Sequence, residues 1–145
     1  MFESLTVFLP QLQGDEYGEW IIDRTNDGTP EHPIQFPFVE YGRTVTDLID
    51  AIYQFIDNNK EMELNNYRGI LEASNIEWNS ESMKKADVTA LDGKTVMAML
   101  IGAVRAERFC DGALLDFCKD GSIAKWLQRL KELDNASQAV KKGAS

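Results

Sequence analysis

The sequence predicts a mainly helical α+β domain, a compact bundle of five or six helices with a small β-hairpin-like element near the N-terminus. Apolar residues recur at helical spacing through most of the chain after residue 43. Residues 92–110 are apolar on nearly every side, which is typical of a central helix. Three of the four prolines fall among residues 29–41, where apolar residues alternate instead. The length of 145 residues indicates one domain. We expect it to span residues 1–134, followed by a flexible tail over 135–145.

The first forty residues predict a short helix and an antiparallel strand pair. Pro10 should end the helix because proline lacks the backbone N–H and clashes with the preceding turn. Residues 19–23 alternate like a strand, and residues 26–28 (Asn-Asp-Gly) are a strong turn signal. Apolar side chains alternate again over residues 34–38, where Pro37 restricts the segment to an edge strand.

The remaining elements are helices. Residues 44–56 carry apolar side chains at helical spacing, and residues 64–74 and 80–85 predict two shorter helices. Asp92 is a good N-cap for the central helix, and Asp111 is expected to cap a short helix over residues 112–119. Gly121 suits a left-handed helix exit, and a last amphipathic helix follows from residue 122 to about residue 134.

The net charge of −9 is spread unevenly and limits the classes of partner. Residues 1–42 carry −7, residues 43–91 carry −4, and residues 92–145 carry +2. The basic footprint of a nucleic-acid-binding protein is absent, so no direct nucleic-acid binding is expected. No run is long and apolar enough for a membrane span, and residues 1–13 do not resemble a signal peptide. The acidic first third could bind a basic protein or mimic a phosphate backbone, or it could simply confer solubility.

No cofactor is expected, because the cysteines, the histidine and the glycines do not form the pattern of a known cofactor site. Cys110 and Cys118 lie among apolar neighbours without a CxxC spacing, which indicates reduced, buried thiols in a cytoplasmic protein. His32 is the only histidine, so a metal site is not expected. No glycine-rich phosphate loop is present.

A charged cluster at the end of the central helix is the candidate site. It consists of Arg105, Glu107, Arg108 and Asp111. At about 100° per residue, Glu107 continues the face of Leu100 and Ala103, so it should approach the core. A buried charge must find partners, and we expect these in the other cluster members, in Arg24 or in a side chain of the strand region.

Three interpretations of the charged cluster remain open. The helix could simply emerge into water, with its arginines favoured near the negative end of the helix dipole. The charges could form a buried structural ion-pair network. Alternatively, Arg105 and Arg108 could grip a phosphate or carboxylate while Glu107 or Asp111 orients the ligand or acts as a general base.

Two segments carry a family resemblance. Residues 28–38 (GTPEHPIQFPF) and 104–130, with the run R-x-E-R-F-C-D-G at residues 105–112, resemble a family of bacterial proteins known only as a domain of unknown function. The resemblance spans about residues 3–134 and marks the charged cluster as the most characteristic part of the family. It implies a helix ending in this run and two further helices, but no activity, cofactor or partner.

Two hypotheses for function follow. The first is a small acidic cytoplasmic protein that acts as a non-enzymatic protein-interaction module, with a protein partner bound through the acidic N-terminal third. The second is a binder of an anionic small molecule, or an enzyme, that uses Arg105, Glu107, Arg108 and Asp111. The sequence favours the first because no group of residues requires a catalytic explanation. It predicts neither the partner nor the oligomeric state.

Overall fold

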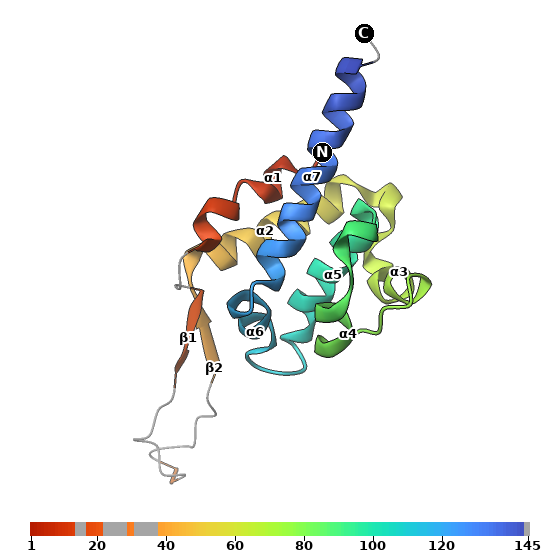
Figure 1. The fold of residues 1–145 in the computed structure, drawn as a ribbon. Coiled ribbons are helices and arrows are strands. Elements are labelled where there is room, and N and C mark those ends of the chain that lie inside the picture. The colour runs from red at the N-terminus through yellow and green to blue at the C-terminus, as the bar shows by residue number, and fades with distance from the viewer. Residues whose placement is uncertain (14–16, 22–28, 31–37, 144–145) are drawn as a thin grey trace.

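The computed structural model describes residues 1–13, 17–21, 29–30 and 38–143. Within these residues the chain forms a helical bundle with one two-stranded antiparallel sheet, which confirms the predicted fold class (Figure 1). The α-helices are α1 (Glu3–Thr6), α2 (Arg43–Asn58), α3 (Tyr67–Ala73), α4 (Ser80–Lys85), α5 (Gly93–Ala106), α6 (Ala113–Lys119) and α7 (Ser122–Gly143). The 3-10 helices are η1 (Leu9–Gln13), η2 (Lys60–Met62), η3 (Leu64–Asn66) and η4 (Val88–Ala90).

Helix α5 forms the centre of the bundle, as its composition predicts. Every residue from Thr95 to Val104 is buried. Helices α2, α3, α6 and α7 all contact α5, so the helix needs no polar face (Figure 1). The helix begins where predicted, because the Asp92 side chain accepts a 2.8 Å hydrogen bond from the Thr95 backbone N–H.

The two strands are β1 (Gly18–Ile21) and β2 (Phe38–Tyr41), and they pair in antiparallel register with Trp20 opposite Val39. The first strand agrees with the prediction. Of the second predicted segment, residues 34–38, only Phe38 is described, and it belongs to β2. Residues 22–28, which include the predicted turn, and residues 31–37 lie outside the described residues. The strand pair lies beside α6 at one end of the molecule (Figure 1).

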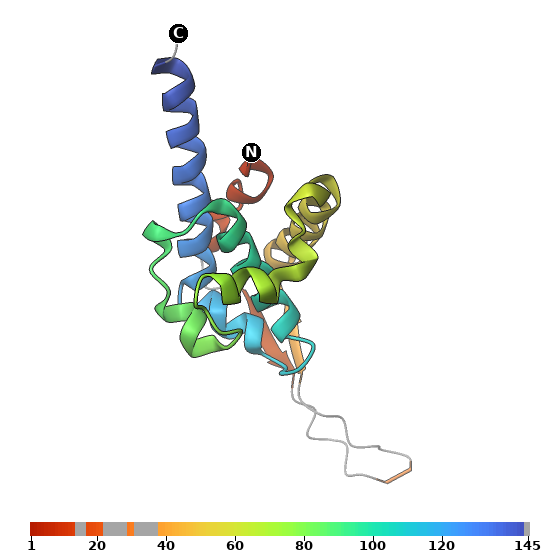
Figure 2. The same cartoon turned by 90° about the vertical axis from the view of Figure 1, so that its right-hand side faces the viewer.

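Helix α7 is longer than the sequence pattern indicates. Its apolar stripe ends near Leu133, but the helix continues to Gly143 through the segment predicted as a tail. Residues 135–142 contain neither proline nor glycine, so no strong helix breaker interrupts them before Gly143. This end of α7 projects away from the bundle, on the side opposite to the hairpin (Figure 2). Among the described residues, no helix is both long and apolar enough to cross a membrane.

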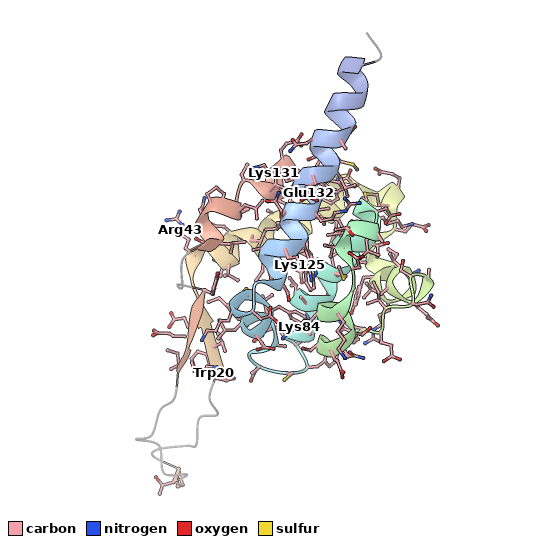
Figure 3. The ribbon with its side chains drawn as sticks, in the orientation of Figure 1. Trp20, Arg43, Lys84, Lys125, Lys131 and Glu132 are labelled. Atoms are coloured by element: carbon pink, nitrogen blue, oxygen red, sulfur yellow. The ribbon has the colours of Figure 1, made fainter. Side chains whose placement is uncertain are left out.

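Lys84 joins α4 to α6 (Figure 3). Its Nζ lies 2.6 Å from Asp116 Oδ2 and 2.7 Å from Asp120 Oδ2. Burial opposes the charge on Lys84, but the hydrogen bonds to both carboxylates outweigh it and raise the pKa of the amine. Burial also favours neutral Asp120, yet hydrogen bonds from Lys84 and Ser122 lower the pKa of this carboxyl group.

Replacing Lys84 with Met should lower the stability of the protein, and it should also make that stability less dependent on acid pH. The folded pKa of Asp120 is below its ordinary value of 3.8. Its contribution to stability is therefore present above about pH 4 and is lost as the pH falls through the folded pKa. K84M should lower Tm by about 2–4 °C at neutral pH. Between neutral pH and pH 3, its Tm should fall by less than that of the wild type.

Calorimetry across this pH range measures both effects. The matched control is K85M, because Lys85 is exposed and, among the described residues, pairs only with Glu81 on its own helix. If the Tm of K84M fell with pH as steeply as that of the wild type, Lys84 would not be the group that lowers the pKa of Asp120.

Candidate functional site

The charged cluster lies at the turn between α5 and α6, which spans residues 107–112 and is called the α5–α6 turn below. Arg105 is in the last turn of α5, and Glu107, Arg108 and Asp111 follow in the turn itself. Gly112 adopts a positive φ of 90°, which is easily reached only by glycine, and reverses the chain into α6. The sequence run therefore forms a tight corner between two packed helices.

Glu107 is held by four hydrogen-bonding contacts from three donor groups. Its carboxylate accepts from the Tyr41 hydroxyl at 2.6 Å and from the Leu114 N–H at 3.0 Å. The Gly112 N–H lies 3.0 and 3.1 Å from the two carboxylate oxygens. The helical projection correctly places Glu107 towards the interior, where it is half-buried. Its partner is a side chain of the strand region, one of the predicted alternatives, and no cation among the described residues pairs with it. Arg24, another predicted partner, lies outside the described residues.

Glu107 also takes the role that the sequence assigns to Asp111. The N-cap position of α6 is Gly112, and Asp111 is exposed without a capping hydrogen bond. The prediction that Asp111 caps α6 is therefore wrong. The reason is the tight corner, which brings the Glu107 carboxylate back onto the free N–H groups at the start of α6.

Tyr41 connects this carboxylate to the hairpin and to α6 at once. Its hydroxyl donates to Glu107 and accepts a 3.0 Å hydrogen bond from the Leu115 N–H. Burial, followed by the hydrogen bond and negative charge of Glu107, raises the pKa of Tyr41 far above its usual value of 10. The phenol therefore stays protonated and remains a donor at any physiological pH.

Trp20 makes the second contact between the hairpin and the α5–α6 turn. A Cβ atom at Gly112 would overlap the Trp20 indole, so the glycine permits this close approach as well as the positive φ. Trp20 projects from β1 at the end of the hairpin that faces the turn (Figure 3). The two strands are therefore fixed to the bundle through Tyr41 and Trp20.

The other members of the charged cluster do not join Glu107. Arg105 is half-buried, and its guanidinium lies 5.5 Å from the centre of the Tyr53 ring. Its Nε is buried without a hydrogen-bond acceptor in the described part of the chain. Arg108 and Asp111 are exposed, and neither forms an ion pair with another described residue.

An apolar pocket of about 300 Å³ lies beside the turn, between α4, α5 and α6. Its wall is formed chiefly by Trp78, Met83, Phe109, Cys110 and Phe117. The Phe109 ring packs edge-on against Trp78 with centroids 5.6 Å apart, yet 75% of Phe109 is exposed. None of the four charged-cluster residues lines this pocket. Sequence reasoning missed it, although a phenylalanine between charged residues was a usable signal.

The two cysteines differ. Cys118 is buried as predicted, and burial, followed by the charges of Asp120 and Glu107, raises the pKa of its thiol to about 12. The prediction that Cys110 is buried is wrong, because the α5–α6 turn carries it out to the surface at the edge of the apolar pocket. Its apolar neighbour Phe109 is exposed as well and lines the same pocket.

The sequence predicts no metal site, and this prediction concerns both the described residues and His32. The described residues contain no group of three or more His, Cys, Asp and Glu side chains that could hold a metal ion. His32 lies outside the described residues.

Comparison with known families identifies the chain at the family level. The model of a family of unknown function, DUF6508, matches residues 2–136. The chain belongs to this family. The DUF6508 match extends from the start of α1 into α7, so the hairpin, the α5–α6 turn and the apolar pocket all lie within it. Comparison with curated proteins and with solved structures gives no match.

Tyr41 and Glu107 should be energetically coupled. Y41F removes one hydroxyl and should lower the free energy of unfolding by about 1–2 kcal/mol, whereas E107Q should lower it by about 2–3 kcal/mol. Because the two groups share a hydrogen bond, the double variant should lose about 1 kcal/mol less than the sum of the single losses.

Urea unfolding of the four proteins measures this coupling. The matched control is Y53F, since the Tyr53 hydroxyl makes no hydrogen bond within the described residues. Strict additivity of Y41F and E107Q would show that the contact does not stabilise the fold.

Proposed function

We propose that this protein is a non-enzymatic protein-interaction module that binds a basic partner protein through the outer face of its hairpin. The observation that carries the proposal is a pair of exposed glutamates, Glu19 and Glu40, which lie directly opposite each other on β1 and β2.

The hairpin has two chemically different faces, because successive side chains of a strand point to opposite sides. One face carries Trp20 and Tyr41, which contact the α5–α6 turn. The outer face carries Glu19, Glu40 and Phe38. Phe38 is 38% exposed, which is high for a large apolar residue. The outer face thus combines negative charge with an aromatic side chain, and aromatic residues are enriched where proteins bind each other.

The opposed glutamates carry an energetic cost. Like charges directly across a strand pair destabilise the pair. Neither glutamate forms an ion pair with another described residue. Within the described residues nothing compensates this repulsion, and a feature that weakens the fold in this way is typical of a functional surface. Lysine or arginine side chains of a partner would relieve this repulsion. Residues 1–42 carry a charge of −7, which would attract such a basic partner.

The attachment of the hairpin supports the same proposal. A two-stranded hairpin alone is marginal in water, but this one is fixed through Tyr41 to Glu107 and through Trp20 to Gly112. A surface held in place before binding loses less conformational entropy when the partner arrives.

The non-enzymatic part of the proposal is supported by the state of Glu107. Its carboxylate already receives the Tyr41 hydroxyl and two backbone N–H groups, so taking a proton from a substrate would disturb the start of α6. We further propose a bacterial, cytoplasmic protein, in keeping with the family resemblance and with two free thiols, of which Cys110 is exposed.

Reversing the charge of the outer face should abolish partner binding. The variant E19K/E40K should reduce the affinity at least about tenfold, and wild-type binding should weaken as salt increases. The matched control is E61K/E72K, which makes the same charge change at exposed acids of η2 and α3. Helix α3 lies on the side of the bundle away from the strand pair (Figure 1).

Proteins captured by the wild type and the control, but not by E19K/E40K, would be purified and titrated by calorimetry. Direct binding with the stated difference between variants supports the proposal. A partner that binds all three proteins equally would overturn it.

A second candidate is a site for an anionic small molecule at Arg105 and Arg108. The observation that favours it is the Arg105 Nε, which is buried and has no acceptor in the described residues. Arg108 follows one helical turn later and lacks an ionic partner there as well, so an anion could meet both guanidinium groups. Asp111 would orient such a ligand only by accepting a hydrogen bond from a hydroxyl or other donor group, because its charge repels an anion and Glu107 is already engaged.

A thermal-shift titration with phosphate and citrate tests this candidate. Binding should raise the wild-type Tm by several degrees at saturation, and R105M/R108M should lose the shift. The exposed Arg43 supplies the control, R43M, which should keep it. Equal shifts in all three proteins would show that the anions act non-specifically.

A further inference from the structure

Phe109 is the most exposed large apolar side chain among the described residues. It is 75% exposed, compared with 58% for Val7 and 45% for Trp20. It stands at the rim of the 300 Å³ apolar pocket, whose wall includes Trp78, Met83 and Phe117. A projecting aromatic ring therefore lies directly beside a cavity that could hold another ring.

We propose that the α5–α6 turn is the interface of a homodimer, in which Phe109 of each copy enters the apolar pocket of the other. In a two-fold dimer every contact occurs twice, so the surface must complement itself. The turn satisfies this requirement because the projection and the cavity lie side by side on one chain.

The charges around Phe109 are self-complementary as well. Arg108 and Asp111 belong to the same turn, are exposed, and have opposite signs. They do not pair with each other or with any other described residue. Across a two-fold axis, Arg108 of each copy can reach Asp111 of the other, which places two ion pairs at the edge of an apolar centre.

This pattern favours a second copy over a small charged ligand. A ligand with one sign of charge would be attracted by Arg108 and repelled by Asp111, or the reverse. A second copy presents both signs in the required arrangement. The interface is separate from the outer hairpin face formed by Glu19, Phe38 and Glu40, so the dimer would leave that face open.

Sedimentation velocity from micromolar to millimolar protein tests the dimer. The wild type should shift from monomer to dimer with concentration. F109A should weaken dimerisation at least about tenfold, since central aromatic residues contribute most to such interfaces. V7A, which shortens an exposed apolar residue at the C-cap of α1, should dimerise like the wild type.

A charge swap tests the predicted pairing independently. R108D and D111R should each weaken the dimer about tenfold, because both copies then bring like charges together. The double variant R108D/D111R should return to within about threefold of the wild type. Circular dichroism and Tm confirm that these surface variants remain folded.

Nuclear magnetic resonance locates the interface. The indole N–H signal of Trp78, at the pocket wall, should move with protein concentration, whereas that of the buried Trp126 should not. Monomeric protein at all concentrations, an unaffected dimer in F109A, or a swap that fails to restore binding would overturn the proposal. A monomer whose Trp78 signal moves on adding free indole would assign the pocket to a small ligand instead.

Discussion

The Glu107 carboxylate is the contact on which the arrangement of the α5–α6 turn and the hairpin depends. It receives the Tyr41 hydroxyl from β2 and the first free N–H groups of α6. The residue at the C-cap of the central helix therefore also caps the start of the next helix and fixes the strand pair through its side chain. The contact combines an ionised acceptor with partial burial, which makes each of its hydrogen bonds stronger than an exposed neutral one. Without it, the N–H groups of Gly112 and Leu114 would lose their acceptor.

The same turn separates a structural interior from an exposed exterior. Glu107 points into the fold, while Arg108, Phe109, Cys110 and Asp111 are exposed. This division explains why a highly charged sequence run can follow an almost entirely apolar helix. The Glu107 carboxylate is stabilised by hydrogen-bond donors of the protein itself, and the exterior residues stay available for contacts with other molecules. The proposed dimer uses this exterior, whereas the proposed partner surface uses the hairpin that the interior contact holds in place.

The parts of the site differ in how well the sequence predicts them. Helical projection places Glu107 correctly, because the geometry of α5 is local and regular. It cannot identify Tyr41, which lies 66 residues earlier in the chain and reaches Glu107 only through packing. Capping preferences favour Asp111 at the start of α6, but they depend on local sequence alone. They do not take into account the tight turn that brings the Glu107 carboxylate to the same N–H groups. For Cys110, apolar neighbours in sequence are a poor guide within a turn.

The sequence by itself determined the helical class, the central position of α5 and the first strand, because hydrophobic periodicity and local turn residues encode them. It also determined the family, whose model matches residues 2–136. Only the tertiary structure decided what the charged residues do. The helix spacing that predicts four charges at one helix end is the same whether they bind a ligand, each other or the backbone. That choice depends on Tyr41, Trp20 and Trp78, which come from distant parts of the chain and meet the turn only when the bundle is packed.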